Sequence, residues 1–368
     1  MSKTYDGIGV ITIPGHFNYG NRLQCYATQQ ILSRYSSRVD TLEFVEERPM
    51  VYLKRFAKML LQKPAKTREM SMSPERRKAF DAFQSLISCR EVSVFDSELE
   101  AEYQFFVVGS DQVWNPRFMR RYRYPELLQF APKEKSIALS ASIGARELGK
   151  RHQKLFAVAL REFKSISVRE ESASMIIEKL IGEAPAVLVD PTLMLDETSW
   201  RAIANDGLLP DEPYVLVYSL GDKSHAVLEL CESVMRVHGA TRIVWLSDAD
   251  DGREVPAGPS EFLSLVANAE AVVTDSYHGT IFSIIFKKQF FVFERAGSPD
   301  MFSRLETLLG QLSLQDRFFD VNCGQRVLGE DCAIDYTAAN VLLAEQQSKF
   351  EGYLKTCFSD CNALNRGV

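Results

Sequence analysis

Short apolar segments alternate with amphipathic helical segments along almost the whole chain, and this alternation constrains the fold most. In the first half, apolar strands are expected at 7–13, 39–44, 105–108, 136–140, 166–169 and 187–189. Helical patterns fall at 23–35, 151–163 and 171–181, and a polar loop is expected at 14–21. Strands that alternate with helices are typical of a parallel sheet covered by helices on both faces. The sequence therefore predicts an α/β fold.

The alternation restarts after a polar segment at 190–213, which contains three prolines. Further strands are expected at 214–219, 241–246, 271–274 and 290–293, with helices at 226–237, 260–267, 280–286 and 337–354. A chain of 368 residues is too long for one ordinary core. We therefore expect an N-terminal α/β domain at 1–195, a C-terminal α/β domain at 211–335, and a helical tail at 336–368 that packs back across the join.

The composition is that of a soluble globular protein in a reducing compartment. No run of 18 or more apolar residues occurs, and the N-terminus has no signal-peptide core. Seven cysteines, an odd number that is widely scattered, favour free thiols over a disulfide framework. We therefore expect a cytoplasmic protein, and we expect no nucleic-acid partner.

One region of the N-terminal half is strongly basic. Residues 48–90 contain eleven basic side chains against three acidic ones, although the net charge of the chain is −6. The electrostatic field of such a basic region concentrates anions or anionic surfaces near it. Within this region, 50–63 has the pattern of a cationic amphipathic helix, which can lie on an anionic membrane or cover an ordinary core. The density of basic residues favours peripheral contact with the inner membrane face, and the second interpretation stays open.

An apolar run in the second half breaks into small polar residues around one histidine. Residues 270–274 have the composition of a buried parallel strand, and 281–286 continue as an apolar helix. Between them the mouth of the helix carries, in order, Ser276, His278, Gly279 and Thr280. Unpaired amides and the helix dipole favour anions at such a mouth. A single histidine is more often a core residue, but this setting leads us to expect a catalytic histidine with three substrate-binding neighbours.

The loop after the first strand carries Asn18, Asn21 and Arg22. Its glycines have the gap of a P-loop, but Asn21 and Arg22 stand where a P-loop needs Lys and Ser or Thr. A nucleotide-phosphate cradle is therefore not expected. We expect all three polar residues to bind substrate, and a glycine turn with a purely structural role stays as the alternative.

Three more polar side chains follow the ends of central strands. Ser110 and Asp111 come after the strand at 105–108, and Ser142 follows the next strand. Two open α/β domains that face each other place a cleft at the carboxyl ends of their strands, so we expect these residues to bind substrate there. Trp114 could stack on a sugar ring, but a core position is the preferred interpretation.

Arg169 stands at the end of a strand, immediately before Glu170. Its guanidinium can fork onto a carboxylate or a phosphate, which lysine does less well. A surface ion pair with Glu170 or Glu171 explains it equally well. No histidines and carboxylates fall at the spacing of metal ligands, so we expect no intrinsic metal.

Six motifs together resemble those of the polysaccharide pyruvyl transferase family. They lie, in order over most of the chain, at 18–24, 109–114, 140–144, 167–170, 189–192 and 274–280. The resemblance implies a glycosyltransferase-B-like pair of Rossmann-like domains facing a cleft, with the acceptor on the N-terminal side and the donor on the C-terminal side. It implies catalytic roles for His278 and Arg169, with Arg169 among the donor-binding residues. Some members carry an arginine before the histidine, where this chain has Ser276 and Tyr277.

The resemblance further implies an enzyme that moves the pyruvyl group of phosphoenolpyruvate onto two hydroxyls of a sugar, which makes a cyclic ketal. This chemistry needs a general acid and cations for the donor, and no redox cofactor. We expect phosphoenolpyruvate as the donor substrate, no cofactor, and a lipid-linked oligosaccharide of capsule or exopolysaccharide biosynthesis as the acceptor. Two alternatives stay open: a nucleotide-sugar-dependent glycosyltransferase of the same architecture, and a non-catalytic scaffold that binds a glycan in the cleft.

Overall fold

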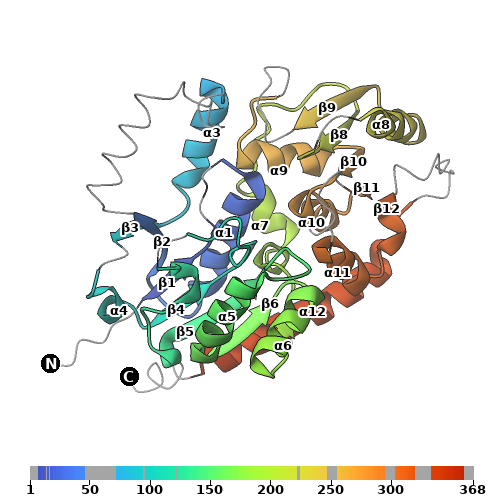
Figure 1. The fold of residues 1–368 in the computed structure, drawn as a ribbon. Helices are drawn as coiled ribbons and strands as arrows, with labels where there is room; N and C mark the ends of the chain where they lie inside the picture. Colours follow the sequence, from blue (N-terminus) through green and yellow to red (C-terminus); the bar gives the residue numbers. More distant parts are fainter. Residues whose placement is uncertain are drawn as a thin grey trace, which may run out of the picture.

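The described part of the chain forms two parallel sheets that are flanked by helices (Figure 1). A computed structural model describes residues 7–13, 15, 17–45, 72–93, 96–120, 123–221, 224–246, 255–294, 303–319 and 333–359. The predicted α/β fold with two Rossmann-like units is confirmed by the order and direction of the strands in both sheets.

The first sheet has the strand order β3-β2-β1-β4-β5-β6-β7. Its strands are β1 (Ile8–Ile11), β2 (Val39–Val45), β3 (Cys89–Ser93), β4 (Phe105–Val108), β5 (Ser136–Ala141), β6 (Ser165–Val168) and β7 (Ala186–Val187). Its helices are α1 (Tyr19–Leu32), α3 (Pro74–Gln84), α4 (Leu99–Glu102), α5 (Lys150–Ala159) and α6 (Glu171–Ile181). The order reverses between the neighbours β1 and β4, and ligands of open α/β sheets bind beyond the strand ends at such a point.

The second sheet has the order β12-β11-β10-β8-β9. Its strands are β8 (Tyr214–Tyr218), β9 (Arg242–Leu246), β10 (Ala271–Thr274), β11 (Gln289–Phe293) and β12 (Phe318–Phe319). The helices that follow the first sheet are α7 (Glu197–Arg201), α8 (His225–His238), α9 (Pro259–Asn268), α10 (Tyr277–Ile285) and α11 (Ser303–Gln311). The order of this sheet reverses between β8 and β10, so its own ligand position lies at the carboxyl end of β10.

Helices α1 and α10 begin four and three residues earlier than the sequence patterns predict, and both differences concern the candidate site. Helix α1 begins at Tyr19 because the Asn18 side chain accepts a hydrogen bond from the amide of Asn21, so the expected loop ends sooner. Helix α10 begins at Tyr277 because Ser276 caps it in the same way. As a result His278 lies in the first turn of a helix rather than in a loop.

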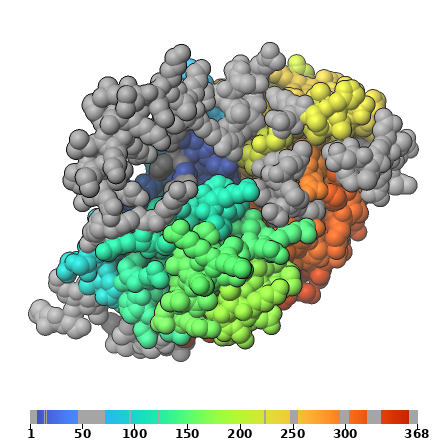
Figure 2. Space-filling model, in the orientation of Figure 1, coloured from blue at the N-terminus to red at the C-terminus, as the bar shows by residue number. Residues whose placement is uncertain are grey.

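The two units share an apolar interface. The Tyr19 ring of α1 stacks on Phe262 of α9 at a centroid distance of 5.0 Å, and it meets the edge of Tyr218 at 5.5 Å. Trp200 of α7 lies between the units: its ring packs on Phe282 of α10 at 4.9 Å and on Tyr26 of α1 at 5.8 Å. The space-filling view shows the green surface of the first unit beside the yellow and orange surface of the second (Figure 2). Buried aromatic pairs of this kind hold the units in one relative position.

The long helix α12 (Tyr336–Cys357) connects the two units. Near its start, the Tyr336 hydroxyl donates to the carbonyl oxygen of Lys288 at 2.5 Å, in the second unit. Near its end, the Tyr353 hydroxyl donates to the carbonyl oxygen of Ala138 at 2.7 Å, in strand β5. The helix therefore lies across the join between the sheets (Figure 1).

Only part of the basic region is described. Residues 48–71, including the expected amphipathic helix at 50–63, lie outside the described residues. In α3, the Arg76 guanidinium is buried 5.2 Å from the ring centroid of Tyr19, whereas Arg77 and Lys78 are exposed. Among the described helices, none is long and apolar enough to cross a membrane.

Candidate active site

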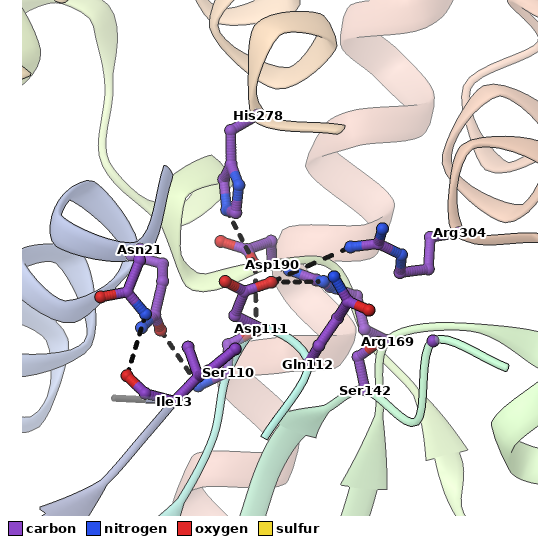
Figure 3. A network of polar contacts seen from close by, with 12 residues as sticks. Ile13, Asn21, Ser110, Asp111, Gln112, Ser142, Arg169, Asp190, His278 and Arg304 are labelled. Atoms are coloured by element: carbon purple, nitrogen blue, oxygen red, sulfur yellow. Dashed lines mark hydrogen bonds and ion pairs between the residues drawn. The ribbon is translucent and has the colours of Figure 1, made fainter. Parts of the chain in front are cut away.

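A pocket lies between the two units, at the carboxyl ends of strands from both sheets (Figure 3). The first unit contributes Asn18, Asp111 and Gln112 to its wall, and the second unit contributes Tyr218, Asp275, Ser276, Tyr277, His278 and Arg304, among others. This placement follows from the topology, because parallel strands end at one edge of a sheet and the two edges face each other.

His278 extends from α10 toward the first unit. The imidazole Nε2 lies 3.7 Å from Oδ2 of Asp190, which follows β7 in the first unit. Nε2 is buried and makes no hydrogen bond with any described residue, while His278 as a whole is 6 % exposed in the pocket wall. The histidine and its facing carboxylate thus belong to different units, and the pair exists because the units are docked.

Gly20 fixes the position of the imidazole from the other side. A Cβ atom added to Gly20 in α1 would lie 2.0 Å from Nδ1 of His278. Contacts under 3.0 Å are not made by real Cβ atoms, so only glycine lets α1 lie this close to the ring. This is a packing reason for the glycine, because helix α1 itself does not require one.

We expect Gly20→Ala to lower kcat by about 10²-fold, since displacing a reacting group by an ångström can have that effect. The measurements are the turnover rate and the melting temperature. Gly352→Ala in α12 is the matched control, because nothing lies within 4 Å of the added Cβ. That control should keep full activity and gain about 0.5–1 kcal/mol of stability. A Gly20→Ala variant with native kcat would contradict the packing argument.

Asp190 is the centre of a buried polar network. Its Oδ2 accepts hydrogen bonds from Nη1 of Arg169 at 2.6 Å and from the Ser110 hydroxyl at 2.9 Å. Its Oδ1 accepts from the amide and the hydroxyl of Thr192. Burial alone would raise the pKa of Asp190, but the facing His278 and the Arg169 guanidinium lower it below the ordinary value. The carboxylate is therefore held ionised.

Arg169 links two carboxylates and does not line the pocket. Besides Asp190, it donates from Nη2 to Oδ1 of Asp111 at 3.1 Å, and its side chain is fully buried. Burial lowers the pKa of Arg169, but the anions around it and Tyr277 outweigh burial and raise the pKa. The sequence predicted that Arg169 either binds the donor or forms a surface ion pair with Glu170 or Glu171. The structure corrects both, because its partners are Asp190 and Asp111.

Ser142 and Glu170 hold the loop behind Arg169. The Oε1 atom of Glu170 accepts from the Ser142 hydroxyl at 3.0 Å and from the amides of Ile143 and Gly144. Ser142 is fully buried and does not line the pocket. The prediction that Ser142 binds substrate is therefore corrected: its hydroxyl orients the Glu170 carboxylate.

The predicted residues of the first loop separate into two groups. Asn18 lines the pocket. Asn21 donates from Nδ2 to the carbonyl oxygen of Ile13 at 3.1 Å and accepts from Arg22, while Nη1 of Arg22 donates to Gln84 of α3 at 2.7 Å. Both side chains are buried outside the pocket, so their assignment to substrate binding is corrected to a structural role.

The predicted residues around His278 also divide. Ser276 lines the pocket and caps α10. Gly279 packs against Thr274, so that an added Cβ would lie 2.4 Å from the Thr274 hydroxyl. The Thr280 hydroxyl is fully buried and donates to the carbonyl oxygen of Ser276. Gly279 and Thr280 therefore shape the first turn of the helix and do not face the pocket, which corrects their assignment to substrate binding.

The family model for polysaccharide pyruvyl transferases matches residues 18–297. The chain belongs to this family. A comparison with curated proteins finds no match.

Solved structures with a similar chain trace are distant. UDP-N-acetylglucosamine 2-epimerase from Rickettsia bellii is 11 % identical over 99 % of both chains, with a TM-score of 0.44. A putative epimerase of the same kind from Listeria monocytogenes is 12 % identical over 94 % of this chain and 97 % of its own, with a TM-score of 0.43. An E. coli heptosyltransferase is 12 % identical over 78 % and 88 %, with a TM-score of 0.35.

In this member of the pyruvyl transferase family, four of the six motifs contribute to one polar network at the edge of the pocket, and a fifth lines the pocket through Asn18. The four contribute Asp111, Arg169, Asp190 and His278, which are joined by the contacts above. Asp111 and Ser110 thus occupy the predicted strand end, although Ser110 bonds to Asp190 and only Asp111 faces the pocket. Trp114 is in the core, as the preferred interpretation expects, and donates to the carbonyl oxygen of Glu126.

Sequence reasoning did not select Asp190, Tyr277 or Arg304 as site residues. Asp190 follows a strand in the pattern Val-Asp-Pro-Thr, which was a usable signal. Arg304 lies in α11, where an arginine in a helix carries no local sign of function. Within the described residues, no group of three or more His, Cys, Asp or Glu side chains is placed to hold a metal ion.

Proposed function

We propose that the protein transfers the pyruvyl group of phosphoenolpyruvate to two hydroxyls of a sugar, forming a cyclic ketal during capsule or exopolysaccharide biosynthesis. One observation carries the proposal: His278 lines a pocket between two Rossmann-like units, and its imidazole Nε2 lies 3.7 Å from the buried, ionised carboxylate of Asp190 in the other unit. Histidine gives and takes protons near neutral pH, and a carboxylate that faces the ring can orient it. The family membership of the chain supports the same reaction class.

The reaction has two bond-forming steps. A proton from His278 goes to the methylene carbon of phosphoenolpyruvate, which becomes a methyl group, and the first sugar hydroxyl adds to the central carbon. The second hydroxyl then forms the other C–O bond as the bond to phosphate breaks. The two hydroxyls lose two protons, of which one replaces the proton from His278 and the other leaves on hydrogen phosphate. A positioned acid of this kind contributes about 10²- to 10⁴-fold to the rate.

Arg169 has a positioning role in this proposal. Its guanidinium is already bonded to Asp190 and Asp111, so it sets the orientation of the carboxylate that faces His278. The pocket also has an ionised carboxylate at Asp111: burial raises the pKa of Asp111, but the interactions with Arg169, His278 and Arg304 together outweigh burial and lower it. Asp111 and Asn18 line the pocket from the first unit, and in this proposal they bind the hydroxyls of the acceptor.

The acceptor in this proposal is a lipid-linked oligosaccharide at the inner membrane face. The support is the charge of 48–90, where eleven basic side chains stand against three acidic ones. Anionic lipids and the diphosphate of a lipid-linked sugar both attract such a region.

The test is release of inorganic phosphate from phosphoenolpyruvate with galactose, mannose and N-acetylhexosamine acceptors. Each acceptor is offered free and as a lipid-linked oligosaccharide in anionic vesicles. Acceptor-dependent release with formation of a ketal supports the function, and faster release with the vesicle-bound form supports the lipid-linked acceptor. Binding of a nucleoside diphosphate without phosphate release from phosphoenolpyruvate would favour the glycosyltransferase. Glycan binding without any turnover would favour the non-catalytic scaffold.

A further inference from the structure

Arg304 is a buried cation without a close partner among the described residues. Its side chain extends from α11 into the pocket wall and is 6 % exposed. Its Nε makes no hydrogen bond with any described residue, and its Nη1 lies 3.9 Å from Oδ1 of Asp111, beyond hydrogen-bonding distance. Burying a guanidinium in this way is costly unless an anion completes its hydrogen bonds.

The contrast with Arg169 shows which arginine is available to a ligand. Arg169 spends its two terminal nitrogens on Asp190 and Asp111, at 2.6 and 3.1 Å. Of these two carboxylates, only that of Asp111 lies near Arg304, and its distance from Arg304 is longer than its distance from Arg169. Burial, and after it the charge of Arg169, lower the pKa of Arg304 to about 10. Arg304 is thus charged at neutral pH, and the carboxylate of Asp111 beside it is already hydrogen-bonded to Arg169.

The Tyr277 ring, in the pocket wall, lies close to both guanidinium groups. The carbon Cζ of Arg169 lies 4.2 Å from the centroid of the Tyr277 ring, and that of Arg304 lies 5.6 Å from it. Both distances are in the range of cation–π attraction. The ring therefore supports two like charges in one small volume, where they would otherwise repel each other. Tyr277 immediately precedes His278 in α10, so the ring that contacts Arg304 belongs to the residue next to the reacting histidine.

We propose that Arg304, supported by the Tyr277 ring, binds the phosphate group of the donor. This inference rests on the proposed function. A guanidinium presents a rigid fork of donors that matches phosphate oxygens and is weakly hydrated, so it suits a dry pocket. A dianion gains more than a carboxylate from an unbalanced positive charge at low dielectric, and phosphate is also the leaving group. Arg304 would thus bind the donor and stabilise the departing phosphate.

The experiment is calorimetric titration of the full-length protein with inorganic phosphate and, separately, with pyruvate. Because hydrogen bonds to charged groups are among the strongest, Arg304→Gln should weaken phosphate binding by about 10- to 100-fold and leave pyruvate binding unchanged. Arg304→Lys keeps the charge without the fork, so its phosphate affinity should lie between those of the native protein and Arg304→Gln. Arg146→Gln is the control. It removes an exposed arginine that faces Glu306 of α11, the helix that carries Arg304, and it should bind phosphate normally.

A second pair of variants tests the support by Tyr277. Tyr277→Phe keeps the ring and should retain native phosphate affinity. Tyr277→Leu removes the ring and should weaken phosphate binding by about 2- to 30-fold, the range of a cation–π interaction. Equal affinities in the two variants would overturn the role of the ring.

The outcomes separate the inference from the proposed function. Titration with phosphate needs neither acceptor nor turnover, so Arg304-dependent binding in a protein that forms no ketal leaves the phosphate site standing and removes the function. Native phosphate affinity in Arg304→Gln overturns the site even if ketals form. An equal loss for phosphate and pyruvate overturns the assignment to phosphate. If Arg304→Gln had a lower melting temperature and bound neither phosphate nor pyruvate, Arg304 would have a structural role instead.

Discussion

The His278→Asn variant is expected to bind phosphoenolpyruvate and to release phosphate from it about 10²- to 10⁴-fold more slowly than the native protein, which is the usual contribution of a positioned acid. Asparagine fits in the space beside Gly20 but cannot deliver a proton near neutral pH. The imidazole makes no hydrogen bond with a described residue through Nε2, so its loss should not unfold the protein. The measurements are kcat at saturating acceptor and the melting temperature.

His225→Asn is the matched control for this variant. His225 begins α8 with its side chain 86 % exposed, and its nearest acidic neighbour is Glu229. Its replacement should change neither kcat nor melting temperature. If His278→Asn were as active as this control, the imidazole would have no part in catalysis, and the non-catalytic glycan-binding scaffold would become the better explanation of the pocket.

The second large effect is expected on stability. Asp190→Asn should lower the free energy of unfolding by about 3–5 kcal/mol, because it leaves the fully buried Arg169 without one of its two carboxylate partners. Urea denaturation at pH 7 measures the loss. Asp196→Asn is the control, since Asp196 caps α7 through an exposed hydrogen bond to the Ser199 amide that asparagine can replace.

The stability difference between the native protein and Asp190→Asn should also depend on pH. The pKa of Asp190 is lowered in the folded protein, so its stabilising contribution is complete above the pKa of an unfolded aspartate, about 3.9, and is lost as the pH falls toward the folded value. The difference in unfolding free energy between native protein and Asp190→Asn should therefore be constant above about pH 5 and shrink as the pH falls below about 4. A difference that stays constant down to pH 3 would show that Asp190 is not held ionised.

The sequence predicted the sheets better than the helix starts, and there is a physical reason. Buried parallel strands such as β4 and β10 are continuous apolar runs that are visible locally. The start of α1 depends on one side-chain hydrogen bond from Asn21 to Asn18, which moved the boundary from the expected residue 23 to Tyr19. Capping by Ser276 moved the start of α10 in the same direction.

The arginines show why the site was only partly predictable. Arg22, Arg169 and Arg304 carry the same fork, and the sequence offers no reason to prefer the third. Their roles depend on partners distant in the chain: Gln84 for Arg22, and Asp190 with Asp111 for Arg169. Arg304 differs at its terminal nitrogens: its Nη1 lies 3.9 Å from Oδ1 of Asp111, beyond hydrogen-bonding distance, whereas both terminal nitrogens of Arg169 are hydrogen-bonded. A residue type indicates what a side chain can bind, whereas the fold decides what it has already bound.

The path of α12 has a consequence for motion. The imidazole and its carboxylate come from opposite sides of the join and are 3.7 Å apart, so a small hinge rotation would uncouple them. Helix α12 is bonded to the second unit through Tyr336 and to the first through Tyr353, and a rotation that opens the cleft must strain one of these anchors. The C-terminal helix thus restrains such a rotation and helps to keep His278 opposite Asp190.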